Sequence, residues 1–87
     1  MNIDFTKKYR KSFSKIKSKK VRKAAKEAAE KVMAAKDQRD IPLKKLSGFK
    51  NAYRIKIGDY RIGVRIEQQT IYFAEIGHRK DIYDMFP

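Results

Sequence analysis

The sequence predicts an α+β fold in which two helices cover one face of an antiparallel sheet. Three observations predict it: a short alternating segment at the N-terminus, two successive segments of helical periodicity, and three successive segments of strand periodicity. Strands that follow a pair of helices favour segregated helices and strands over an alternating α/β architecture. With 87 residues, 41% of them hydrophobic, the chain is expected to fold as one domain, 1–87.

The N-terminal half is expected to form one strand and a helical hairpin. Ile3-Asp4-Phe5 alternates like a short strand, and Thr6 is a candidate N-cap for a helix that runs to about Lys17. The apolar side chains near helical spacing in this segment are Phe5, Tyr9, Phe13 and Ile16. Ser18 can cap a second helix, whose narrow apolar stripe is Val21, Ala24, Ala25, Ala28, Val32 and Ala35.

The C-terminal half is expected to contain the sheet. The polar segment 37–40 and Pro42 end the helical region. An irregular stretch then carries three expected apolar anchors: Leu43, Leu46 and Phe49. Three strands follow as a meander over residues 51–57, 60–67 and 70–76, with Gly58-Asp59 and Gln68-Gln69 as the turns. The tail from Gly77 onward is expected to leave the last strand.

Alternation separates apolar from basic side chains in the first two strands of this meander. The apolar set, which the helices are expected to cover, is Ile55, Ile57, Ile62, Val64 and Ile66. The basic set on the opposite face, which is expected to stay open, is Arg54, Lys56, Arg61 and Arg65. Like charges on neighbouring strands repel, so this pattern indicates a polyanionic ligand.

The overall composition narrows the classes of partner. Lys and Arg number 23 against 10 Asp and Glu, a net charge of +13, which attracts nucleic acid, anionic lipid or an acidic protein. There is no cysteine and only one histidine, so neither a thiolate metal site nor a multi-histidine metal cluster is available. We expect no cofactor. No apolar run approaches the roughly 20 residues of a membrane span, and the N-terminus lacks a signal-peptide pattern. We therefore expect a cytoplasmic protein that does not bind membranes.

Three segments together resemble the RelE/ParE superfamily of bacterial and archaeal toxins. They are Leu46-Ser47-Gly48, the hairpin from Tyr53 to Arg61, and the segment Gly77-His78-Arg79-Lys80-Asp81-Ile82-Tyr83. The likeness covers nearly the whole chain. The order Gly-His-Arg-Lys in the last segment is closer to the RelE branch, because ParE-branch chains tend to read His-Gly-Arg-Arg there.

The resemblance implies a toxin that enters the ribosomal A site and cleaves mRNA without a metal ion. It also implies a co-encoded antitoxin that holds the toxin inactive, and operator DNA bound only through that antitoxin. By the same resemblance, Arg54 and Lys56 lie against the scissile phosphate, Arg61 and Arg79 are further arginines of the site, and Tyr83 lies near the leaving group. Arg54 departs from the best-studied pattern, which has lysine there, and arginine is a very poor proton donor or acceptor.

Metal-free RNA cleavage needs a base for the 2′-hydroxyl, cations for the phosphorane and an acid for the 5′-oxygen. Lys56 is the candidate base, and Arg61 and Arg79 suit the phosphorane because guanidinium offers paired donors. Tyr83 is a candidate proton donor or base-stacking residue. Three further residues are expected to bind RNA: Arg65, His78 and Lys80. His78 is also an alternative acid or base.

Two other functions stay open from the sequence. One is a ParE-like inhibitor of DNA gyrase, which binds without RNA chemistry. The other is a nucleic-acid-binding module with no catalytic activity. The simplest interpretation is that the basic sheet face is only solvated and binds nothing. Codon preference and the antitoxin's identity have no signal in the sequence.

Overall fold

Five strands form one mixed sheet in a computed structural model that describes residues 1–87. The strands are β1 (Asn2–Phe5), β2 (Leu43–Lys45), β3 (Ala52–Ile57), β4 (Tyr60–Glu67) and β5 (Thr70–His78). Their order across the sheet is β1-β5-β4-β3-β2, with β1 parallel to β5 and the other pairs antiparallel. The predicted α+β class and the three-stranded meander are confirmed, and β1 and β2 extend the meander at its two edges.

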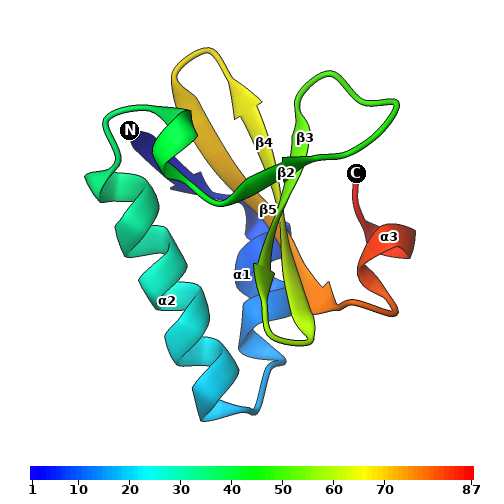
Figure 1. The fold of residues 1–87 in the computed structure, drawn as a ribbon. Helices are drawn as coiled ribbons and strands as arrows, with labels where there is room; N and C mark the ends of the chain where they lie inside the picture. Colours follow the sequence, from blue (N-terminus) through cyan, green and yellow to red (C-terminus); the bar gives the residue numbers. More distant parts are fainter.

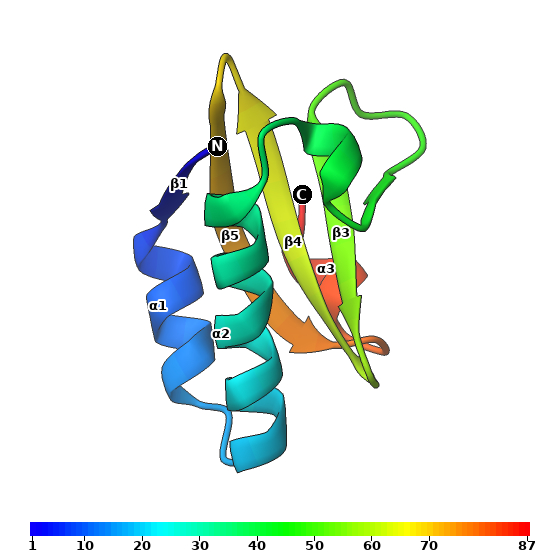
Figure 2. The ribbon, with the colours of Figure 1, turned by 60° about the vertical axis from the view of Figure 1, so that its left-hand side comes forward.

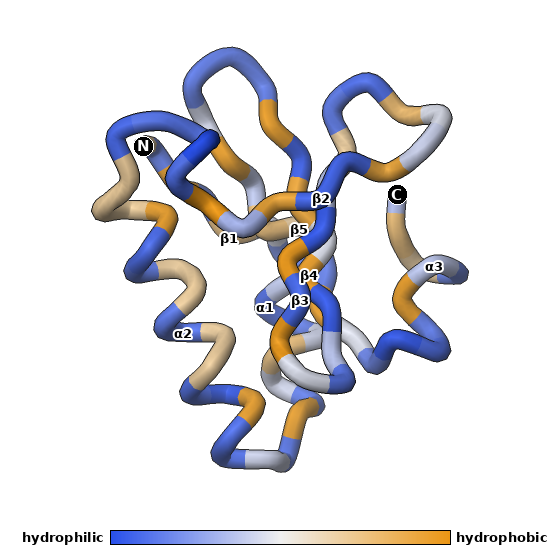
Figure 3. Tube along the Cα trace, in the orientation of Figure 1, coloured by the Kyte–Doolittle hydropathy of each residue, from blue (hydrophilic) through white to orange (hydrophobic).

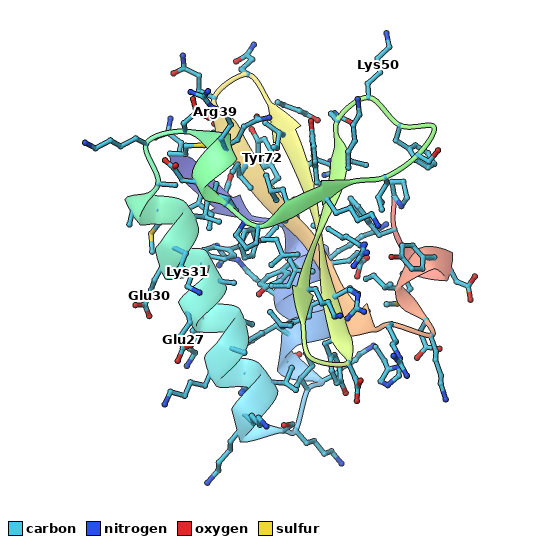
Figure 4. The ribbon with its side chains drawn as sticks, in the orientation of Figure 1. Glu27, Glu30, Lys31, Arg39, Lys50 and Tyr72 are labelled. Carbon is cyan, nitrogen blue, oxygen red and sulfur yellow. The ribbon has the colours of Figure 1, made fainter.

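The two long helices lie side by side on one face of the sheet, and a short helix lies on the other (Figure 1 and Figure 2). The helices are α1 (Lys7–Ser14), α2 (Lys19–Ala34), the 3-10 helix η1 (Gln38–Asp40) and α3 (Ile82–Met85). Glu27, Glu30 and Lys31 are exposed on the outer side of α2 (Figure 4). The molecule thus has three layers: α1 and α2 on one side, the sheet in the middle, and α3 on the other side.

Both predicted helix starts are confirmed by their capping bonds. The hydroxyl of Thr6 accepts from the backbone N–H of Tyr9 at 3.1 Å, and the hydroxyl of Ser18 accepts from Val21 at 3.2 Å. The prediction that the first helix reaches Lys17 is wrong, because α1 ends at Ser14. Arg22 of α2 donates to the carbonyls of Phe13 and Ile16 at 3.2 and 3.0 Å, so a side chain satisfies carbonyls that a further helical turn would otherwise bond.

The main core lies between the two long helices and the sheet. The sheet contributes Ile55, Ile62 and Val64 as predicted, together with Ile71, Phe73 and Ile76 of β5. From α2 come Ala25, Ala29 and Val32, of which Ala29 lies outside the predicted stripe. Figure 3 shows hydrophobic and hydrophilic residues alternating along β3 and β4, as a sheet with one face on this core requires.

The prediction that the opposite face stays open is wrong. A second, smaller core lies there and consists of Ala52, Ala74, Ile82 and Phe86, with Leu46 packed against it. The tail does not leave the sheet early either, since β5 continues to His78 and the chain then folds back through α3. The physical reason is that Ile82 and Phe86 bury apolar area against a part of the face that carries no large side chains.

The expected irregular stretch contains a strand. β2 has three residues and pairs Leu43 with Ile55, Lys44 with Arg54 and Lys45 with Tyr53. Leu43 and Leu46 are partly buried as expected, but Phe49 is 48% exposed and anchors nothing.

Candidate functional site

Basic side chains meet on the sheet face opposite α1 and α2. Lys56 and Arg61 are direct cross-strand partners, and Arg54 is the partner of Lys44 on β2 and of Gly63 on β4. Side chains so paired lie with Cβ atoms about 4.5–5.5 Å apart on one face. We call the group Lys44, Arg54, Lys56 and Arg61 the cationic face.

Arg61 is held rigidly within the cationic face. Only 8% of the residue is exposed, and its Nη1 donates to the carbonyls of Gly58 and Tyr60, both at 2.8 Å. Nε and Nη2 of Arg61 have no hydrogen-bond partner in the protein. They are not buried, because every buried side-chain nitrogen or oxygen in the molecule does have a partner. These two nitrogens therefore reach solvent and can donate to a ligand.

Arg79 is brought to the same end of the sheet by its backbone. Its N–H donates to the carbonyl of Asp59, in the turn between β3 and β4, at 2.8 Å. The carbonyl of the preceding residue, Gly58, accepts a hydrogen bond from the Arg61 side chain. Arg79 and Lys80 are both exposed, so their side chains are free to reach a ligand near this turn.

Tyr83 lies in α3, beside the cationic face. The preceding residue, Ile82, packs over Gly77, and Gly77 is the cross-strand partner of Arg61. Tyr83 itself is 55% exposed, so its phenol is accessible from solvent.

Arg65 shares this face but lies apart from the other cations. It is four residues along β4 from Arg61, which is about 13 Å at the usual strand rise. Phe86 covers Gly63 between the two arginines. Nε of Arg65 is 3.9 Å from the carboxylate of Glu67, a loose ion pair.

His78 lies on the other face of the sheet. His78 is the cross-strand partner of Tyr60, and their rings meet edge to face with centroids 5.5 Å apart. The next pair along the two strands on the same face is Ile62 and Ile76, which the helices cover. Nδ1 of His78 accepts from the N–H of Lys80 at 3.1 Å. The ring lines a groove of about 660 Å³ beside α1, together with the lysines Lys8, Lys11, Lys15 and Lys17. The sheet thus separates His78 from Lys56 and Arg61.

Two residues near the cationic face, Lys44 and Gly63, and one in the groove beside α1, Glu75, were not predicted from the sequence. Lys44 had no signal, because a three-residue strand leaves no periodicity to detect. Gly63 did have a signal in the sequence, because a glycine inside a strand often marks a close approach of another segment. Glu75, the partner of Gly63 on β5, is 9% exposed and accepts from the hydroxyl of Ser12 at 3.3 Å. A lone buried acid within a strand has no sequence pattern of its own.

The acidic and imidazole side chains are dispersed. No three of them gather where they could hold a metal ion. None of the helices is long and apolar enough to cross a membrane.

A known family of small toxins includes this chain. The family model described as the ParE toxin of the type II toxin–antitoxin system, parDE, matches residues 3–83. The chain therefore belongs to the ParE toxin family, within the RelE/ParE superfamily of type II toxins.

RelE toxins are similar to this chain in sequence and in fold. The toxin in the RelB–RelE antitoxin–toxin complex of Methanococcus jannaschii is 34% identical, with a TM-score of 0.78 over 95% of this chain and 98% of that one. Toxin RelE3 of Methanocaldococcus jannaschii is 49% identical over 47 residues, so the match spans about half of either chain, 54% of this one and 53% of that one. The isolated E. coli RelE toxin, 21% identical with a TM-score of 0.66 over 97% of this chain and 92% of that one, shares the fold. The chain is thus a RelE-like toxin.

Proposed function

We propose that this RelE-like toxin is a ribosome-dependent endoribonuclease that cleaves mRNA in the A site and so stops translation. The observation that carries the proposal is the direct pairing of Lys56 with Arg61 on one sheet face, with Arg54 adjacent. An ammonium and two guanidinium groups at cross-strand distance suit one RNA phosphate. Their mutual repulsion is relieved when that phosphate is bound.

The reaction starts at the ribose 2′-hydroxyl of the nucleotide before the cut. Lys56 is the proposed base, because its side chain is exposed and it lies beside the arginines that would hold the phosphate. The neutral amine takes the 2′-proton while the 2′-oxygen bonds to phosphorus. Arg54, which cannot serve as a base, is assigned to grip the phosphate.

The phosphorane gains negative charge on its non-bridging oxygens. Nε and Nη2 of Arg61 are aimed before substrate arrives, since Nη1 is already fixed to two carbonyls. A donor that needs no rearrangement as charge develops stabilises a transition state more than a mobile one does. Arg79, exposed near the same turn, adds a second guanidinium.

The last step breaks the bond from phosphorus to the 5′-oxygen. Tyr83 is the proposed proton donor to that oxygen, or the ring on which the neighbouring base stacks. The products are a 2′,3′-cyclic phosphate and a 5′-hydroxyl. Arg65, His78 and Lys80 are proposed to bind RNA away from the cut, His78 from the lysine-rich groove beside α1.

The proposed partners follow from the charge and from the relatives. Solved RelE relatives are described as complexes with RelB antitoxins, which supports a cognate antitoxin for this chain. With a net charge of +13, the toxin suits an antitoxin with an acidic or amphipathic segment. We propose that the pair is cytoplasmic, and that operator DNA is bound only through the antitoxin. The proposed reaction uses neither a cofactor nor a metal ion.

A ParE-like inhibitor of DNA gyrase is the second candidate, supported by the description of the matching family model. A non-catalytic nucleic-acid-binding module is the third. The RelE identity of 34% over nearly the whole chain favours the nuclease over both.

One experiment separates the three candidates. Purified toxin is added to ribosomes programmed with a defined mRNA, and the 5′ ends are mapped. We expect breaks within the A-site codon that disappear with Arg79→Ala, whose side chain is exposed and makes no hydrogen bond or ion pair in the structure. Lys20→Ala removes the same charge from α2 and should cut normally. Intact mRNA with gyrase-dependent DNA breaks would establish the second candidate, and neither effect the third.

A further inference from the structure

The C-terminal segment rests on the cationic side of the sheet through two buried side chains. Ile82 and Phe86 are each 2% exposed, although they stand within six residues of the chain end. Backbone bonds fold the segment between them, with the N–H of Phe86 donating to the carbonyl of Ile82 at 2.8 Å. A helix of four residues is too short to hold its shape without such tertiary contacts.

Glycines provide the space that these side chains occupy. A Cβ added at Gly63 would lie 2.5 Å from Cγ and Cδ2 of Phe86, and one added at Gly77 would lie 2.6 Å from Cε of Met85. The contact at Gly63 is with ring atoms of the buried Phe86, so only glycine at position 63 admits the segment at this depth, whereas the contact at Gly77 is with the flexible end of Met85, which can move aside. Gly63 is the partner of Arg54, and Gly77 is the partner of Arg61. The segment is therefore registered against the cationic face itself.

Tyr83 depends on this seating for its position. It follows the anchor Ile82 directly and precedes Phe86 by three residues, yet it is 55% exposed and makes no side-chain hydrogen bond in the structure. Only its neighbours in the segment fix the position of Tyr83 relative to the sheet.

We propose that Phe86, seated on Gly63, is a positioning residue that holds Tyr83 at the scissile linkage. The inference rests on the proposed function for its kinetic consequence, and it adds a residue that touches no substrate. Without the Phe86 ring the segment keeps only the Ile82 anchor, and Tyr83 samples positions away from the cationic face. Phe86 then affects the chemical step through Tyr83 alone.

The test is a double-mutant cycle on single-turnover cleavage. Phe86→Ala is expected to slow cleavage by about the same factor as Tyr83→Ala, with no change in the ribosome concentration that gives half the maximal rate. Adding Phe86→Ala to Tyr83→Ala should change the rate by less than about twofold. Phe86→Leu, which refills most of the space, should restore most of the rate, and Asp84→Asn is the matched control in the same helix.

Three kinetic results would overturn the inference: additive losses in the double mutant, a loss confined to ribosome affinity, or a Tyr83→Ala variant that cuts like the wild type. A second measurement does not depend on cleavage. The backbone order parameters of residues 82–85 should fall from about 0.85 to below about 0.6 in Phe86→Ala, with the sheet unchanged. Unchanged order parameters refute the positioning role, even if the wild type leaves mRNA intact and the proposed function fails by itself.

Discussion

Arg61 has two roles at the scale of a single residue. One edge of its guanidinium closes the β3–β4 turn, and the other faces solvent on the cationic face. The same contacts that orient the group for its proposed role at a phosphate also support the fold. A loss of activity in an Arg61 variant therefore has to be separated from a loss of stability.

Arg61→Ala should lower the free energy of unfolding by about 1–3 kcal/mol, because it removes two hydrogen bonds from a charged, nearly buried donor. Arg61→Lys keeps the charge but not the planar fork, so we expect an intermediate loss. Urea unfolding measures both. An alanine variant as stable as the wild type would show that the turn does not need the guanidinium.

Tyr9 makes stability depend on alkaline pH. Burial raises the pKa of Tyr9 from 10.0 to about 12, so the folded protein holds this proton more tightly than the unfolded chain does. Its contribution is full below pH 10 and is lost as pH rises through 12. The free energies of unfolding of wild type and Tyr9→Phe should differ by a constant below pH 10. Above that pH the wild type should lose up to about 3 kcal/mol relative to the variant. Parallel curves would contradict the burial effect.

Strand periodicity predicted which candidate residues of β3 and β4 share one sheet face, whereas Arg79 and Tyr83 were predicted from the family resemblance alone. Lys56 and Arg61 were placed side by side because a two-residue turn fixes the register of its hairpin. His78 was expected to bind RNA together with Arg65 and Lys80, in a tail that leaves the sheet at Gly77. In the structure β5 continues through His78, and the period of two then puts the ring on the helix-covered face.

At the scale of elements, α1 completes the edge of β5 that β1 leaves unpaired. β1 reaches only to Phe73, and beyond it the N–H and hydroxyl of Thr6 donate to the carbonyls of Phe73 and Ala74 at 3.0 Å each. Farther along, the N–H of Ile76 donates to the hydroxyl of Ser12 at 3.4 Å. Hydroxyl side chains of the helix thus take the place of a neighbouring strand.

Thr6→Val should lower the free energy of unfolding by about 1–3 kcal/mol, because it removes the N-cap of α1 and a bond to the edge of β5 without changing the side-chain shape. Ser14→Ala is the matched control. Its hydroxyl bonds only to the carbonyl of Lys11 at an exposed position, so its loss should be within about 0.5 kcal/mol. Equal effects in chemical denaturation would argue against this edge bonding.

Long elements were predictable from the sequence and short ones were not. The Ser18 cap located the start of α2, whose end at Ala34 lies three residues before the polar segment 37–40 that was expected to end it, and the alternating segments located β3 and β4. β2 and α3 have three and four residues, and each exists because of what it packs against rather than because of its own pattern. The glycine at position 63 was the one local sign that something would cover the sheet there.

At the scale of the whole molecule, a net charge of +13 acts on folding and on binding in opposite directions. Self-repulsion opposes the compact state, while the same field attracts RNA. Salt screens both effects. The molecule is therefore expected to be most stable at the high salt concentrations at which it binds RNA most weakly.

Raising the salt concentration should increase the free energy of unfolding and weaken RNA binding. For single-stranded RNA, the logarithm of the binding constant should fall with the logarithm of salt concentration by about 0.7 per phosphate contacted, and Arg54→Ala should reduce the slope by about 0.7. Fluorescence anisotropy across a salt series measures this. A flat response, or an unchanged slope in the variant, would contradict electrostatic contact with RNA at the cationic face.

A variant of Lys56 tests most directly whether the cationic face cuts RNA. Its side chain is exposed and makes no hydrogen bond or ion pair in the structure, so Lys56→Ala should fold as the wild type does. Lys23→Ala removes the same charge from the exposed surface of α2. The measurement is the single-turnover rate of A-site cleavage at saturating ribosomes. We predict a loss of about 10²–10⁴-fold for Lys56→Ala and wild-type cleavage for Lys23→Ala, whereas equal rates in the two variants would contradict the claim.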